Sequence, residues 1–146
     1  MGRLIGAHSA LTRELNAQLV ADHGLTLSEF EVLMLLARAP DGLMRRVDLA
    51  HEVRLSPSGV TRMLDRLEAA GLVGKASCEK DARVTYAQLT ESGVARLDEC
   101  APGQVAAAER LLGERFDDHE LDALVELLGR LSAPADDECG PLAEGS

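Results

Sequence analysis

The spacing of apolar and polar side chains divides the chain into a series of short helices and one pair of strands. Between residues 3 and 22, the side chains of one face recur at steps of three and four, which predicts an amphipathic helix that ends at Gly24. That face consists of Leu4, His8, Leu11, Leu15 and Leu19. A dense apolar run from Phe30 to Leu36 predicts a buried second helix, with Ser28 as its expected N-cap and Pro40 as its stop.

A turn, a very short strand and a third helix are expected next. Asp41 and Gly42 form a turn dipeptide, residues 43–44 have the apolar character of a short strand, and residues 45–53 have helical spacing. The expected buried face of this third helix consists of Val47, Ala50 and Val53.

The stretch from Ser56 to Gly71 carries the sequence marks of both ends of a helix. Ser56 is a good N-cap, Pro57 fits the first helical position, and Gly71 favours the left-handed conformation that ends a helix. The apolar face consists of Val60, Met63, Leu64 and Leu67. Short side chains near the N-terminus would allow a close approach to the DNA major groove, with Arg62 for base edges and Arg66 for phosphates. Taken alone, the same pattern also fits an ordinary solvated helix face.

The two short helices over residues 45–53 and 56–70 have the arrangement of a helix-turn-helix. Arg54 stands in the turn where many such motifs have glycine. We therefore expect Arg54 to adopt a left-handed conformation, at a cost of about 1 kcal/mol. A differently shaped turn is the alternative.

After Gly71 the pattern changes from helical to alternating. Residues 72–78 and 84–90 predict two antiparallel strands, and the polar residues 79–83 between them are of hairpin size. A helix-turn-helix followed by such a ribbon is a winged helix. Its tip carries Lys80 and Arg83 and its incoming strand carries Lys75, so the ribbon would reach the minor groove beside the helix.

The last third of the chain has the pattern of two amphipathic helices. Residues 91 to about 116 place apolar side chains at helical spacing, with Pro102 and Gly103 expected to kink the helix. These side chains are Val94, Leu97, Ala101, Val105, Ala108 and Leu112. Asp117 or Asp118 then caps a final helix. Its stripe consists of Leu121, Leu124, Val125, Leu128 and Leu131. A second copy of the chain and the first helix would bury these stripes, whereas residues 133–146 are expected to form a disordered acidic tail.

The net charge of −10 opposes DNA binding only if it is spread evenly, and it is not. Residues 44–83 hold 8 basic and 6 acidic side chains, whereas residues 84–146 hold 4 and 14. Attraction between cationic side chains and phosphates acts over about 8 Å in physiological salt. The local excess of +2 in residues 44–83, and not the net charge of the chain, therefore determines whether this segment attracts DNA. The acidic remainder lowers affinity for non-specific polyanions and does not exclude a specific site.

The chain carries no motif of enzymatic chemistry, such as a nucleophile elbow, a phosphate loop or HExxH. Its three cysteines and four histidines lack the spacing of a disulfide framework or a metal site, so we expect no enzyme, no metal and no cofactor. Cys100 fits a small apolar filler better than a sensor. Without a long apolar run or a signal peptide, the protein is expected to be cytoplasmic, with no membrane contact.

The joined pattern of helix and wing resembles the MarR family of bacterial transcriptional regulators. The residues that carry the resemblance are LSPSGVTRMLDRLEAAGLV and DARVTYAQLTESG, in which Asp81 and Arg83 match the wing signature. The similarity covers residues 3 to 132. It implies a mostly α fold with a small antiparallel β-wing, in which residues 28–90 form a winged helix-turn-helix domain and residues 1–27 and 91–132 form a helical dimerisation domain.

The resemblance also implies a homodimer that binds double-stranded DNA, and we expect a repressor of a palindromic operator. A small-molecule effector would bind among the first, second and fifth helices, near His8, Met34 and Arg38. The candidate DNA-binding residues are Arg45, Arg46, Ser56, Ser58, Gly59, Thr61, Arg62, Arg66, Lys75, Lys80, Asp81 and Arg83. Arg45 and Arg46 are included because cations at a helix start oppose the helix dipole, which indicates a phosphate partner; an ordinary solvated pair is the alternative.

Two other functions remain open at this point. A winged helix used as a protein-interaction module would suit the acidity of the chain, and it would show no salt-dependent DNA affinity. A thiol-based regulator would sense oxidation through Cys78, whose pKa the neighbouring Lys80 would lower. A small apolar filler fits Cys78 better, because no second cysteine is placed to resolve an oxidised thiol.

Overall fold

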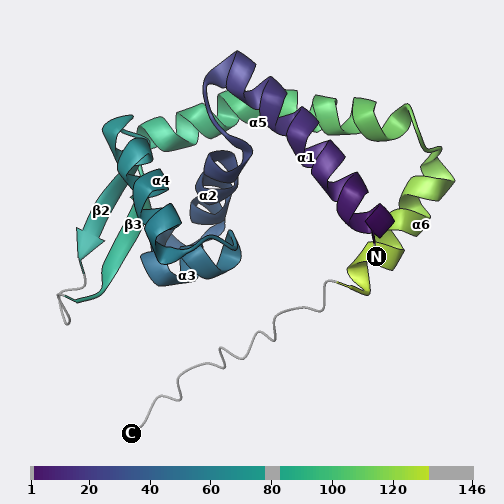
Figure 1. Ribbon diagram of the computed structural model, residues 1–146. Coiled ribbons are helices and arrows are strands. Elements are labelled where there is room, and N and C mark those ends of the chain that lie inside the picture. The colour runs from purple at the N-terminus through teal and green to yellow at the C-terminus, as the bar shows by residue number, and fades with distance from the viewer. Residues whose placement is uncertain (1, 78–82, 132–146) are drawn as a thin grey trace, which may run out of the picture. The chain divides into compact units, whose positions relative to one another are not determined.

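The computed structural model describes residues 2–77 and 83–131 (Figure 1). The helices are α1 (Gly2–His23), α2 (Leu27–Arg38), α3 (Arg46–Glu52), α4 (Pro57–Ala69), α5 (Glu91–Gly113) and α6 (Asp118–Gly129), with one 3-10 turn at Pro40–Gly42. The strands are β1 (Leu43–Arg45), β2 (Val73–Ser77) and β3 (Thr85–Leu89). The predicted fold class, mostly α with a small antiparallel wing, is confirmed.

The chain divides into two compact units at residues 108 and 109, within α5. The first unit holds α1 to α4, the sheet and most of α5, and the second holds the end of α5 and α6. The predicted disordered tail lies outside the described residues. No helix among the described residues is both long enough and apolar enough to cross a membrane.

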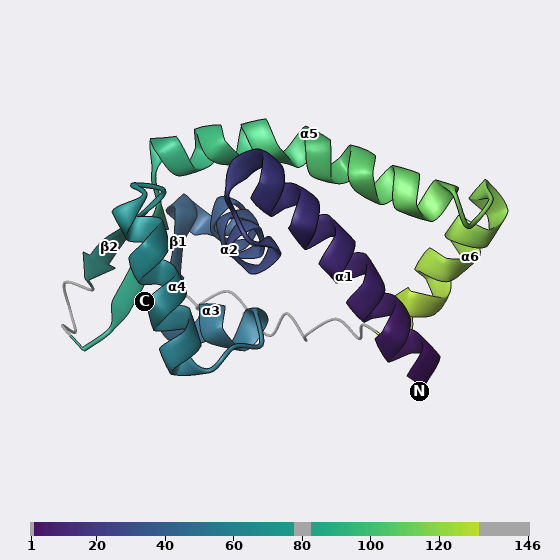
Figure 2. The same cartoon turned by 45° about the horizontal axis from the view of Figure 1, so that its top comes forward.

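The sheet has three strands in the order β1-β3-β2, all antiparallel. Ala87 at the centre of β3 is fully buried and pairs with Met44 on one side and Lys75 on the other. The expected short strand at residues 43–44 therefore forms and extends the predicted ribbon. It also ties the segment before α3 to the base of the wing, where β2 and β3 run side by side (Figures 1 and 2).

The start of α2 differs from the prediction, because Thr26 and not Ser28 is the N-cap. The Thr26 hydroxyl accepts a hydrogen bond from the Glu29 N–H, and the Glu29 carboxylate accepts one from the Thr26 N–H. This reciprocal capping box satisfies two backbone groups that a lone serine cap would not. Ser28 lies instead inside the first helical turn.

The buried face of α3 also differs, since Leu49 and Ala50 are buried while Val47 is 68% exposed. Leu49 lies two residues after Val47, about 200° around a helix. A two-turn helix brings only one side to the core, and the larger Leu49 occupies it. Val53 is half-buried at the end of the helix.

The turn between α3 and α4 is closed by Arg54 in the left-handed conformation, with φ of 53°. The N–H of Arg54 bonds to the carbonyl of His51, and the N–H of Leu55 bonds to the carbonyl of Ala50. This pair of bonds is a Schellman motif, which needs a left-handed residue at the position that Arg54 holds. The predicted conformation is confirmed, in a position that glycine would occupy without steric cost.

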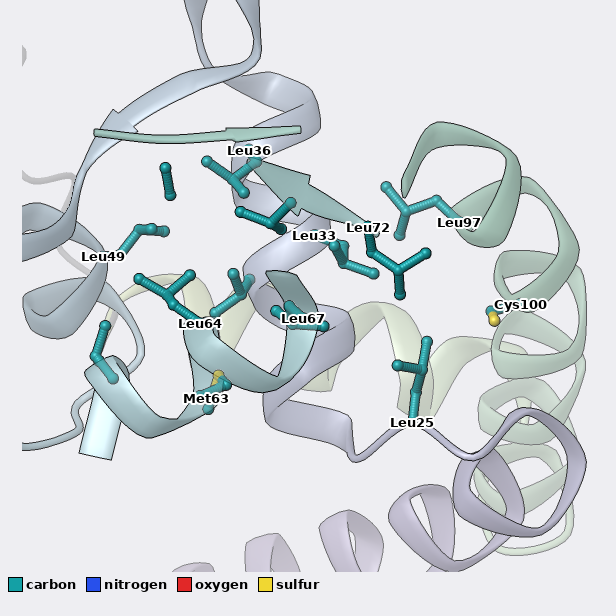
Figure 3. Packing of buried hydrophobic residues seen from close by; sticks show 14 of the residues in the cluster. Leu25, Leu33, Leu36, Leu49, Met63, Leu64, Leu67, Leu72, Leu97 and Cys100 are labelled. Carbon is teal, nitrogen blue, oxygen red and sulfur yellow. The ribbon is translucent and has the colours of Figure 1, made fainter. Parts of the chain in front are cut away.

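α4 has both predicted ends. Ser56 caps its N-terminus, and Gly71, with φ of 73°, ends it through a second Schellman pair in which the N–H groups of Gly71 and Leu72 bond to the carbonyls of Glu68 and Leu67. The apolar face predicted for this helix is buried as a whole. It packs in one cluster with side chains from α2, α3 and the turn before β2, among them Leu33, Leu36, Leu49 and Leu72 (Figure 3), and with Ala87 of β3.

α5 is continuous through Pro102 and ends at Gly113, three residues before the predicted end. Its buried side is formed by Leu97, Cys100, Ala107 and Leu111. Val94 and Val105, placed on the expected stripe, are 47% and 56% exposed. Burial of Cys100 raises the pKa of its thiol, as expected for an apolar filler.

Large apolar side chains of α1 and α6 remain uncovered. Residues 2–10 of α1 are all exposed, including Leu4 at 49% and Ile5 at 60%. α6 is capped by Asp117, one of the two predicted candidates. No residue of α6 is buried, and Val125 is 72% exposed. These exposed side chains lack the cover that an apolar helix face requires.

The start of α5 is packed against the turn that follows α4 so closely that only glycine fits at residue 93. The hydroxyl of Thr90 accepts from the Gly93 N–H and donates to the carbonyl of Gly71. A Cβ on Gly93 would lie 2.2 Å from the carbonyl oxygen of Leu72.

We predict that Gly93→Ala lowers the free energy of unfolding by about 1–3 kcal/mol, because backbone must move to admit the methyl group. Gly103→Ala, on the same helix with no heavy atom within 4 Å of the added Cβ, should be neutral or stabilise by about 0.5–1 kcal/mol. Chemical denaturation of both variants measures the difference. Equal stabilities would contradict the close approach at Gly93.

Candidate nucleic-acid interface

The exposed side of α4 begins with small side chains that its own first turn holds in place. The Ser56 hydroxyl accepts a hydrogen bond from the Gly59 N–H at 3.1 Å and lies 3.2 Å from the Ser58 hydroxyl. The Thr61 hydroxyl donates to the carbonyl of Pro57 at 2.9 Å. Ser56, Ser58 and Thr61 are exposed, so short hydroxyl side chains lie on the surface at the start of the helix. Such a surface allows the close approach that base contacts need.

Arg62 follows on the same side and is exposed. Its guanidinium has no hydrogen bond or ion pair with any described residue. A planar group with five unused donors, beside small side chains at a helix N-terminus, suits recognition of guanine edges. Arg62 therefore lies on the exposed face of α4, as the sequence pattern predicted.

Arg66, predicted as a phosphate contact, is already engaged within the protein. Its Nη2 forms an ion pair with Oε1 of Glu29, a carboxylate that is only 5% exposed. The Arg66 side chain is itself 64% exposed. Sequence reasoning missed this pair because the two residues are 37 positions apart.

Arg46 is engaged as well, and it is not a surface cation. Its Nη2 lies 2.6 Å from Glu68 Oε1, the side chains are 19% and 17% exposed, and Arg46 Nε is buried with no hydrogen-bond partner among the described residues. Lys75 Nζ lies 3.1 Å from the other oxygen of Glu68. Glu68 of α4 therefore links α3, through Arg46, to β2, through Lys75. The main role of Arg46 is to stabilise the fold.

Arg45 stays at the surface, in a two-bond contact with Asp48 at 2.7 and 3.1 Å. The hydrogen bond that Arg45 donates to Asp48, and then the charge of Asp48, raise the pKa of Arg45. Arg45 and Arg46 line a small pocket of about 240 Å³ together with Arg83, which lies just before β3 toward the tip of the wing. The start of α3 and the wing, far apart in the sequence, thus present neighbouring cations.

Three residues singled out from the sequence, Cys78, Lys80 and Asp81, lie outside the described residues. Arg83 is exposed at the first described position after this gap. Among the described residues, no group of three metal-ligating side chains lies close enough to hold a metal ion.

A second, larger pocket lies in the first unit, among α1, α2, the end of α3 and α5. Its volume is about 1060 Å³, and its wall includes all three side chains that were expected near an effector site, His8, Met34 and Arg38. Apolar side chains such as Phe30 and Leu35 share the wall with Arg13 and Arg54. A pocket with an apolar body and a few charged groups suits a small molecule.

These elements define a class of protein. A helix-turn-helix whose second helix is capped, amphipathic and exposed on its polar side, followed by a two-stranded ribbon, is a winged-helix DNA-binding domain.

Comparison with known proteins identifies the family. The MarR family model matches residues 25–85. The repressor YetL of Bacillus subtilis is 32% identical over 111 residues, which span 76% of this chain and 66% of that protein. AbsC, a MarR family regulator of Streptomyces coelicolor, is 30% identical, with 89% of this chain and 90% of AbsC covered and a TM-score of 0.74. Sco3205, a MarR family regulator of the same organism solved in complex with DNA, is 29% identical, with 88% and 81% covered and a TM-score of 0.79.

The chain belongs to the MarR family. It is a DNA-binding transcriptional regulator, and these relatives are regulators and not enzymes, in agreement with the expectation from the sequence.

We predict that Glu68→Gln lowers the free energy of unfolding by about 1–3 kcal/mol, because Arg46 would remain largely buried without a charged partner. The control is Glu126→Gln, which removes the partner of Arg130 from a pair whose side chains are 70% and 68% exposed. That loss should stay within about 0.5 kcal/mol. Thermal unfolding of both variants decides, and a Glu68 variant as stable as the Glu126 variant would show that Arg46 does not need its partner.

Proposed function

We propose that the protein is a homodimeric repressor that binds a palindromic operator in double-stranded DNA and responds to a small molecule. The observation that carries the proposal is the division of α4 into a buried apolar face and an exposed face on which Arg62 has no partner in the described chain. In this arrangement α4 enters the major groove, and Arg83 at the wing lies against the backbone or the minor groove beside it.

The exposed apolar side chains at the start of α1 and along α6 support the homodimer. Apolar helix faces of this size are buried in stable soluble proteins, and a two-fold dimer offers each stripe a copy of itself. Two copies of α4 related by a two-fold axis would meet two half-sites of a palindrome about one DNA turn apart.

The pocket lined by His8, Met34 and Arg38 supports the response to a small molecule. A ligand there would alter DNA affinity only if it bound more tightly to one of two dimer geometries. Repression then follows from occupancy: a dimer on an operator blocks access to the promoter, and a ligand that disfavours the bound geometry releases it.

The test of the function is a selection of bound fragments from random double-stranded DNA, followed by affinity measurements at two salt concentrations. The expected winner is a palindrome preferred over a scrambled control by at least about 10³-fold. Absence of enrichment together with absence of salt-dependent binding would favour the protein-interaction module instead.

On the selected sequence, Arg62→Ala should weaken binding by about 1–3 kcal/mol and relax the preference at one base position of each half-site. Affinity for scrambled DNA should change much less. An equal loss on both DNAs would make Arg62 a phosphate contact.

Arg83→Ala should weaken binding to selected and scrambled DNA alike. It should also reduce the slope of log affinity against log salt by about 0.9 for each phosphate that a wing arginine no longer neutralises. Thr85→Ala, a neutral change on the adjacent strand, is the control. A slope that Arg83→Ala leaves unchanged would remove the wing cation from the interface.

A further inference from the structure

The N-terminus of α2 contains a carboxylate that the fold keeps almost wholly out of water. Glu29 is 5% exposed, and its Oε2 accepts hydrogen bonds from the Thr26 N–H at 2.8 Å and from the Thr26 hydroxyl at 2.9 Å. Its other oxygen, Oε1, accepts from Arg66 on α4. An ionised carboxylate at such a position needs all of these partners, because burial without them is costly.

A hydrogen bond to α1 also fixes the first turn of α2, which carries Glu29. The side-chain oxygen of Asn16 on α1 accepts a hydrogen bond from the Leu27 N–H at 2.9 Å. The first turn of α2 is thus anchored to α1 and closed by its own capping box, and α2 lies between α1 and α4 in both views (Figures 1 and 2). Glu29 is a rigid point from which a partner can be oriented.

Arg66 forms an additional ion pair with Glu29 that the capping box does not require. A capping box is complete with the two bonds between Thr26 and Glu29. The additional bond joins Glu29 to the exposed side of α4, one helical turn after Arg62. Apolar packing sets which face of α4 points outward, and an ion pair at one edge of the helix restricts the small rotations about the helix axis that remain.

We propose that Glu29 is a positioning residue for DNA recognition: its buried carboxylate holds Arg66, and with it α4, at the rotation that aims Arg62 at the bases. The inference rests on the proposed function. It also means that Arg66 serves the interface through Glu29 and makes no phosphate contact of its own in the specific complex.

The substitution that separates these roles is Glu29→Gln. Glutamine at this position still completes a capping box, since its amide oxygen accepts from Thr26. Its NH2 group would then face the Arg66 guanidinium, so the ion pair is lost while the helix cap remains. The matched control is Glu14→Gln, the same change of charge at an exposed position of α1 with no polar partner among the described residues.

The experiment measures affinity of the full-length protein for its selected DNA and for scrambled DNA over a series of salt concentrations, with thermal unfolding in parallel. Wild-type protein that binds no DNA would overturn the proposed function and is recognised before any variant is compared. With wild-type binding established, Glu29→Gln should lower affinity for the selected DNA about 10-fold. Affinity for scrambled DNA should not fall, and its salt slope should steepen by about 0.9 per released arginine, because Arg66 becomes available to phosphate.

Arg66→Gln provides the second arm, since an exposed side chain is replaced. Specific affinity should fall to a similar extent, with the salt slope on scrambled DNA unchanged. The double variant Glu29→Gln/Arg66→Gln should be no weaker in specific binding than either single variant, and it should regain thermal stability relative to Arg66→Gln, because no unpaired carboxylate remains buried.

Three results would overturn the inference. One is a ratio of specific to scrambled affinity in Glu29→Gln equal to that of wild type and of Glu14→Gln. Another is an equal loss on both DNAs with a lower melting temperature, which a purely structural role would produce. The third is a flatter salt slope in Arg66→Gln, which would make Arg66 a direct phosphate contact.

Discussion

Burial of one face of α4 is the constraint on which the DNA-binding surface depends. The buried face of α4 packs in the cluster with α2, α3 and the sheet, so the polar face of α4 must point outward. The buried face consists of Val60, Met63, Leu64 and Leu67. A helix of 13 residues would be marginal alone in water, and this packing is what keeps it formed. The caps at Ser56 and Gly71 fix where it begins and ends, and so fix which side chains stand on the exposed face.

Two carboxylates then divide the cations of the region into different roles. Glu29 engages Arg66, and Glu68 engages Arg46 and Lys75. Arg62 is left without a partner among the described residues. An acidic protein can therefore bind DNA, because salt screens the acidic side chains that lie far from α4. The nearby carboxylates Glu29 and Glu68 are paired with cations of the protein. The net negative charge also lowers affinity for non-specific DNA, which raises the ratio of specific to non-specific affinity.

Much of this architecture is predictable from the sequence because its causes are local. The limits of α4, the left-handed Arg54 and the cap at Asp117 all follow from residue types within a few positions of each other. The errors have the opposite origin. Val47 was placed in the core because a short helix does not reveal which side meets its neighbours. The ion pairs of Arg66 and Arg46 were missed because their carboxylate partners lie 37 and 22 residues away. The capping box of Thr26 and Glu29 could have been predicted from the sequence, because threonine followed three residues later by glutamate is its signature.

The proposed function requires two copies of α4, related by the two-fold axis of a dimer, to bind two half-sites on one face of the DNA. The most direct measurement compares affinity for the selected palindrome with affinity for a version in which about 5 base pairs, half a DNA turn, are inserted between the half-sites. If both copies of α4 bind together, the insertion removes most of the specific affinity and leaves binding close to that of scrambled DNA. Affinity that the insertion leaves unchanged would show that one α4 suffices for binding and that the proposed dimeric contact is wrong.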